Sequence, residues 1–159
     1  MKPVLIALAA GLMVFEFTPA SRAALGWTLD QCKSHFGSEP LTSELDDMGL
    51  MEYEFRTQGY TIRVTLKAGA VISVIYLSPN IDGDTIQQLL SENAPNADWN
   101  HWALMKNGHR ICSGNENGFD KYCAILSKET LRGTPLIRLQ VSSYIMIDLL
   151  QRKHKTRDL

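Results

Sequence analysis

The chain contains 159 residues, with 16 Lys and Arg against 17 Asp and Glu, so its formal net charge at pH 7 is −1. Hydrophobic residues make up 45% and charged residues 21% of the chain, which excludes a disordered, collagen-like or coiled-coil protein. The near-zero charge removes the electrostatic basis for general nucleic-acid binding, so no nucleic-acid partner is expected. The cysteine count is three, an odd number that cannot pair completely within one chain.

The first 23 residues have the layout of a secretory signal peptide. Lys2 is followed by the apolar run Val4–Phe15, and the small residues Ser21 and Ala23 precede a predicted cleavage after Ala23. The apolar run has 12 residues, fewer than the roughly 20 that a membrane-spanning helix needs. We therefore expect an exported protein, periplasmic or extracellular, without an integral membrane span once residues 1–23 are removed.

The remaining chain is predicted to form a single α+β domain. Its boundaries are expected at residues 24–155, with halves at about 24–80 and 81–155 and a tail at 156–159. Export places its cysteines in an oxidising compartment, where disulfides persist.

The first half begins with a helix and continues as a meander. Thr28-Leu29-Asp30-Gln31 has the capping-box form that starts a helix, and residues 38–49 then read as a loop. Apolar and polar residues alternate from Met51, and a turn at Gln58-Gly59 places Phe55 opposite Ile62 and Tyr53 opposite Val64. The next strand, residues 71–77, is apolar on both faces, so its buried face is left open.

The second half has a similar order of elements. A helix is expected after an Asp82 cap, and Pro95 ends it near Asn93. Asn107-Gly108 and Asn117-Gly118 are hairpin signals that divide residues 100–127 into three short strands. A further strand carries Ile137, Leu139 and Val141 inward, and a final helix follows Ser143. The predicted fold is a helix followed by an antiparallel three-stranded meander, loosely repeated twice, with a C-terminal helix.

The cysteines divide into a predicted pair and a remaining thiol. In a two-residue hairpin at Asn117-Gly118, opposed residues have numbers that sum to 235, as those of Cys112 and Cys123 do. Opposed residues have Cα atoms about 4.5–5.5 Å apart, within the disulfide range. We therefore predict a Cys112–Cys123 disulfide. Cys32 is then a free thiol, either buried under Trp27, bridged to another chain, or reactive with help from His35.

Two further clusters are candidate binding sites. Trp99, His101 and Trp102 lie close together before a strand and would either stack on a small ligand or glycan or fill the core. Cys32-x-x-His35 and His109-x-x-Cys112 have the spacing of zinc ligand pairs, but residues three apart on a strand point to opposite faces. No metal site and no cofactor is therefore expected.

A family resemblance rests on the first helix and the meander after it. Residues 26–32, Gly-Trp-Thr-Leu-Asp-Gln-Cys, then Phe36-Gly37 and an aromatic strand, resemble small exported bacterial proteins. The same unit is similar to the SmpA/OmlA domain of outer-membrane assembly lipoproteins and to each half of the β-lactamase-inhibitor-protein fold. The resemblance covers residues 27–78 and, more loosely, 82–142, and it implies a protein that binds other proteins and is not an enzyme.

The leading functional hypothesis is an exported, non-enzymatic protein-binding or envelope-associated module, whose partner is another envelope or secreted protein. The first alternative is a thiol-dependent enzyme or redox protein that uses Cys32. The second is a binder of a small ligand or glycan through Trp99 and Trp102.

Overall fold

The structure, a computed structural model, describes residues 24–37, 39–45, 48–57 and 59–157. The expected signal peptide at residues 1–23 lies outside the described residues, as do Gln58 of the first predicted turn and the last two residues of the expected tail.

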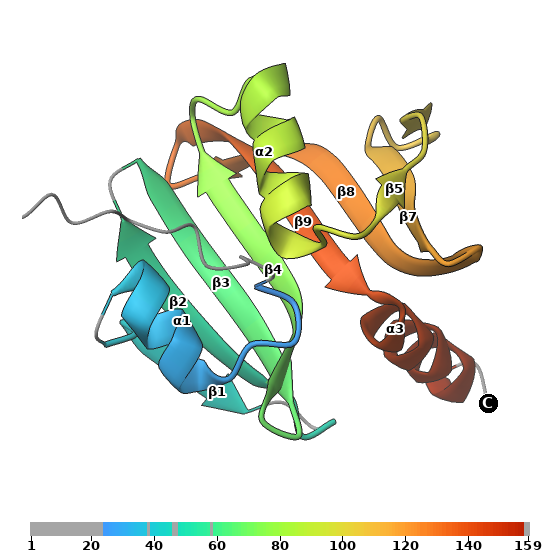
Figure 1. The fold of residues 1–159 in the computed structure, drawn as a ribbon. Helices are drawn as coiled ribbons and strands as arrows, with labels where there is room; N and C mark the ends of the chain where they lie inside the picture. The colour runs from blue at the N-terminus through green and yellow to red at the C-terminus, as the bar shows by residue number, and fades with distance from the viewer. Residues whose placement is uncertain (1–23, 38, 46–47, 58, 158–159) are drawn as a thin grey trace, which may run out of the picture.

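One antiparallel sheet with helices at its face and end forms the domain (Figure 1). The helices are α1 (Leu29–Phe36), α2 (Gly83–Asn93) and α3 (Tyr144–Arg157). The strands are β1 (Thr42–Leu45), β2 (Met51–Thr57), β3 (Tyr60–Lys67), β4 (Ala70–Ser78), β5 (Asp98–Trp99), β6 (Ala103–Leu104), β7 (Arg110–Glu116), β8 (Phe119–Leu131) and β9 (Thr134–Ser143). The nine-stranded sheet has the order β1-β2-β3-β4-β9-β8-β7-β5, and β6 pairs with β7. The α+β class, the antiparallel sheet and the C-terminal helix are therefore confirmed.

Two local signals of the first half are confirmed, the capping box and the register of β2 with β3. The Thr28 side chain accepts from the Gln31 backbone, and the Gln31 side chain accepts from the Thr28 backbone N–H at 2.8 Å, which completes the capping box. Strands β2 and β3 have the predicted register, with Tyr53 opposite Val64 and Phe55 opposite Ile62. These contacts form between chain neighbours, so the sequence pattern is sufficient to predict them.

The chain between residues 38 and 49 is not simply a loop. Residues 42–45 form β1, which pairs with β2 at the edge of the sheet. Its sequence, Thr-Ser-Glu-Leu, has no alternating pattern of apolar residues, so the strand was not predicted.

Strand β4 is buried on both faces, which answers the question that its composition left open. Val74 and Tyr76 face the side covered by helices, and Ser73 and Leu77 on the other face are buried too. The core under α1 and α2 lies on one face, and α3 also contacts β4, β8 and β9. At its edges, β4 pairs with β3 on one side and with β9 on the other. The two halves of the chain therefore meet at the β4–β9 pair.

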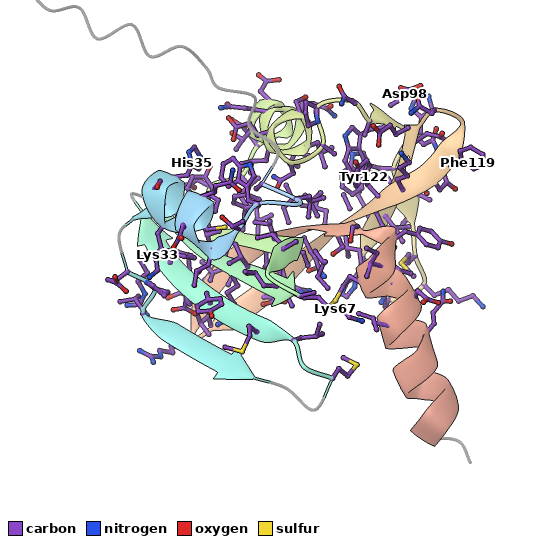
Figure 2. The ribbon with its side chains drawn as sticks, turned by 60° about the horizontal axis from the view of Figure 1, so that its bottom comes forward. Lys33, His35, Lys67, Asp98, Phe119 and Tyr122 are labelled. Carbon is purple, nitrogen blue, oxygen red and sulfur yellow. The ribbon has the colours of Figure 1, made fainter. Side chains whose placement is uncertain are left out.

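Both α1 and α2 cover one face of the sheet. Figure 1 shows α1 in front of β2 and β3, and α2 in front of β4 and β9. Figure 2 shows that α3 extends away on the opposite side of the sheet. The buried core under α1 and α2 draws on both helices and on strands β2, β3, β4, β7, β8 and β9, and among its largest or most buried members are Cys32, Phe36, Phe55, Val64, Val74, Leu90, Ala124, Leu139 and Val141.

Candidate functional site

The predicted Cys112–Cys123 disulfide is wrong. Cys112 lies opposite Ala124, and Cys123 lies opposite Ser113, so the register differs by one residue from the one that the hairpin predicts. Successive side chains of a strand point to opposite faces, so a shift of one residue separates the two thiols. All three cysteines are free, and all three are buried.

A β-bulge causes the shift. The Asn117-Gly118 turn forms as predicted, with Asn115 opposite Asp120, but the next pair is Gly114 with Tyr122, so Lys121 is an extra residue on β8. Glu116 accepts from Lys121 Nζ at 3.1 Å and from the Tyr122 hydroxyl at 3.0 Å across this irregularity. The bulge therefore has its own polar contacts, which a two-residue turn signal does not include.

Next to the bulge, the Trp99 ring occupies the space that a side chain at position 114 would need, so the residue there is a glycine. A Cβ atom at Gly114 would lie 3.1 Å from the Trp99 ring and 3.1 Å from Cβ of Tyr122. The Trp99 and Tyr122 rings pack with their centroids 6.4 Å apart. The Trp99 indole is thus part of the packing between β5 and the neighbouring strands.

The tryptophan cluster does not form one exposed surface. Trp99 and Trp102 are half-buried against the core, whereas His101 is exposed. The Trp99 Nε1 atom is buried and has no hydrogen-bond partner within the part of the chain that the structure describes. Figure 2 shows Tyr122 and Asp98 together at this end of the sheet. This arrangement favours the interpretation of Trp99 and Trp102 as core residues. It does not favour the glycan hypothesis, which needs exposed aromatic rings on which a sugar could stack.

The thiols are poor nucleophiles at neutral pH. Cys32 is fully buried, and burial raises its pKa to about 11, while a backbone hydrogen bond lowers it by less. Burial is also the main cause that raises the pKa of Cys112 to about 12. Since the thiolate is the reactive form, both groups are protonated and unreactive near pH 7.

His35 does not lie beside an accessible sulfur. Its ring packs edge-on against Trp27 with a centroid distance of 5.1 Å and against Phe36 at 4.9 Å. Figure 2 shows His35 with Lys33 on α1. The structure therefore favours the interpretation of Cys32 as a buried structural thiol.

A cavity of about 540 Å³ lies where β7 begins, and the sequence did not indicate it. A volume of this size lies within the range of about 300–1,000 Å³ that is usual for ligand sites. The lining residues come from the segment before α2, the β6–β7 turn, β8 and β9, and they are Ile81, Leu104, Asn107, Gly108, His109, Arg110, Leu126, Ser127, Lys128 and Ile137.

The register explains how the cavity is built. Arg110 is opposite Leu126, and Lys128 is opposite Ile137, so alternation places these four side chains on the helix-covered face of the sheet. Ile81 reaches the same space from the chain before α2. The cavity therefore has apolar residues on its wall and two cationic side chains beside them.

The β6–β7 turn is held in place by its own hydrogen bonds. The Met105 backbone N–H donates to His109 O at 2.8 Å, and the His109 N–H donates to Asn107 Oδ1 at 3.1 Å. The Asn107 Nδ2 atom also lies 3.2 Å from His109 Nδ1. The predicted turn at Asn107-Gly108 thus positions one rim of the cavity, and Leu104 on that rim is 74% exposed.

Among the described residues, the cationic side chains at the cavity, Arg110 and Lys128, are unpaired, whereas other arginines of the sheet form ion pairs with glutamates. Arg63 pairs with Glu54 at 3.0 Å, and Arg138 pairs with Glu129 at 3.3 Å. Among the residues that the structure describes, Arg110 and Lys128 form no ion pair. The cavity rim therefore carries positive charge that is not paired with a carboxylate of residues 24–37, 39–45, 48–57 or 59–157.

No group of three or more His, Cys, Asp or Glu side chains that could hold a metal occurs among the described residues. No helix within the described part of the chain is both long enough and apolar enough to cross a membrane.

Comparison with known proteins finds little similarity. No family model and no curated protein sequence matches the chain. Among solved structures, a cysteine-rich secretory protein from Staphylococcus aureus subsp. aureus Mu50 matches with a TM-score of 0.45 and 11% sequence identity. The match covers 77% of this chain and 44% of that one, so this chain spans less than half of the similar structure.

Proposed function

We propose that this protein is an exported, non-enzymatic binding module, and that a protein partner inserts a segment into the cavity beside the β6–β7 turn. The observation that carries the proposal is the cavity itself, with apolar walls, an exposed Leu104 on its rim and two cations that form no ion pair with another described residue. Export is the part of the proposal that the N-terminal sequence supports.

The thiols support a binding role over thiol chemistry. Cys32 and Cys112 are buried and have raised pKa values, so neither offers a thiolate to a substrate at neutral pH. The cavity, in contrast, is open to a partner at the β6–β7 turn.

The proposal also includes a repeated helix-and-meander unit, similar to the SmpA/OmlA and β-lactamase-inhibitor-protein folds. The candidate repeats are α1 with β2–β4 and α2 with β7–β9, which lie on either side of the β4–β9 pair. In this proposal the second unit carries the binding cavity.

Site-specific photocrosslinking tests the proposed function. The photoreactive residue benzoylphenylalanine would replace Leu104 on the rim or, as a control, Lys67, which pairs with Ala70 at the far end of β4 from the cavity. We expect one protein adduct from the cell envelope with the Leu104 variant, suppressed by excess wild-type protein and missing with the Lys67 variant. Equal adducts at both positions, or none at Leu104, would overturn the proposal.

A further inference from the structure

We infer that the partner is bound as an extended, acidic segment that adds as a strand to the open edge of β8 at residues 127–131. This inference rests on the proposed function and deepens it, because it names the conformation and the charge of the segment that enters the cavity.

The first observation is an unpaired edge on an otherwise central strand. Strand β7 pairs with β8 only as far as Leu126, because the chain turns away at residues 106–108 into β6. Strand β8 continues to Leu131 and there pairs with β9 alone. An edge of this kind presents backbone donors and acceptors to which an extended peptide can pair.

The second observation is that the cavity adjoins this same edge. Ser127 and Lys128 belong both to the open edge and to the cavity lining, and Gly108 and His109 close the other side. Alternate side chains of an added strand would face the cavity, where Leu126 and Ile137 supply an apolar wall. Backbone pairing and side-chain insertion are therefore possible for one bound segment.

The third observation is the sign of the charge. Arg110 is the first residue of β7, and Lys128 lies two residues beyond its partner Leu126, on the same face of the sheet. Glu129 is the nearest acid along β8, but alternation places it on the other face, where it pairs with Arg138. An edge Lys opposes addition of purely apolar strands and favours an acidic one.

Titration of isotope-labelled protein, followed by NMR, tests the inference with three probes. They are an acetylated, amidated Leu-Asp-Leu-Asp-Leu pentapeptide, its counterpart with Asn in place of Asp, and octanoate. We expect the acidic peptide to shift the amide signals of Arg110 and of residues 127–131 and to slow hydrogen exchange in residues 127–131. The Asn peptide should bind about tenfold more weakly, the difference that charge-assisted hydrogen bonds produce.

Matched charge variants localise the effect. The double variant Arg110→Gln with Lys128→Gln should weaken binding of the acidic peptide about tenfold and leave the Asn peptide unchanged. The double variant Arg56→Gln with Lys67→Gln removes the same charge from β2 and β3 and should change neither. Equal affinity of the two peptides, no slowing of exchange in residues 127–131, or tighter binding of octanoate than of the acidic peptide would each overturn the inference.

The two tests fail separately. If benzoylphenylalanine at position 104 captures a partner but the acidic peptide does not bind, the proposed function stands and the strand-addition inference is wrong. If neither succeeds, both are wrong.

Discussion

Cys112 and Cys123 lie on neighbouring strands but on opposite faces of the sheet. Cys112 shares the helix-covered face with its partner Ala124, and Cys123 shares the other face with its partners Ser113 and Ser142. The single extra residue in β8, Lys121, is sufficient for this separation.

The register predicts where a disulfide would form. We expect Ser113→Cys to form a disulfide with Cys123 under air oxidation, because directly opposed residues have Cα atoms within about 4.5–5.5 Å, inside the disulfide range. Mass spectrometry of peptides without reductant would detect it. The wild type should show no intramolecular disulfide, and Ser113→Cys combined with Cys123→Ser is the control. A Cys112–Cys123 peptide in the wild type would contradict the structure.

Stability should fall at alkaline pH because of the buried thiols. Burial raises the pKa of Cys32 from 9.0 to about 11, so the unfolded chain loses this proton at a lower pH than the folded chain does. The contribution is complete below about pH 9 and is lost as the pH rises from 9 towards 11. Denaturant unfolding at several pH values would measure it.

Cys32→Ala is the variant for that experiment. It should lower the free energy of unfolding at neutral pH, since it removes a buried sulfur, and it should make the alkaline decline shallower than in the wild type. The same alkaline slope in both proteins would show that Cys32 is exposed or already deprotonated.

Gly114→Ala should destabilise the fold by about 1–3 kcal/mol, the usual range for overpacking. The new Cβ atom would meet the Trp99 ring and Tyr122 Cβ at 3.1 Å. Thermal or denaturant unfolding measures the change. Gly83→Ala is the matched control, because nothing lies within 4 Å of the added atom, and its effect should stay within about 0.5 kcal/mol. Equal stability of the two variants would contradict the packing of Trp99 on Gly114.

Leu104→Ser separates binding from folding. Because the Leu104 side chain is exposed, stability should change by no more than about 0.5 kcal/mol. The affinity for the acidic pentapeptide should fall roughly tenfold, because the apolar rim is lost. Phe119→Ser removes another exposed apolar side chain, at the β7–β8 turn, and should leave that affinity unchanged. If both variants bind equally well, Leu104 is not part of the site.

Local features were predictable because their determinants are close in sequence. The capping box at Thr28, the Asp82 cap, whose carboxylate accepts from Thr85 N at 2.8 Å, and the end of α2 before Pro95 all follow from neighbouring residues. The pairing of Glu54 with Arg63 is equally local, since one short turn sets the register of β2 and β3.

The candidate site was not predictable in this way. Ile81 and Lys128 are far apart in the chain, and they line one cavity only because β4 and β9 pair and α2 packs over them. The turn at Asn107-Gly108 lies at the site, but it indicated a hairpin rather than a cavity.

The sequence by itself determined the composition class, the helix starts, the tight turns and the inward positions of Val64, Leu139 and Val141. Tertiary structure decided the register beyond the Lys121 bulge, the burial of all three cysteines as free thiols, and the position of the cavity. The physical reason is that caps and turns depend on neighbouring residues. A bulge and a cavity depend on how Trp99, Tyr122 and the cavity-lining residues pack together in space.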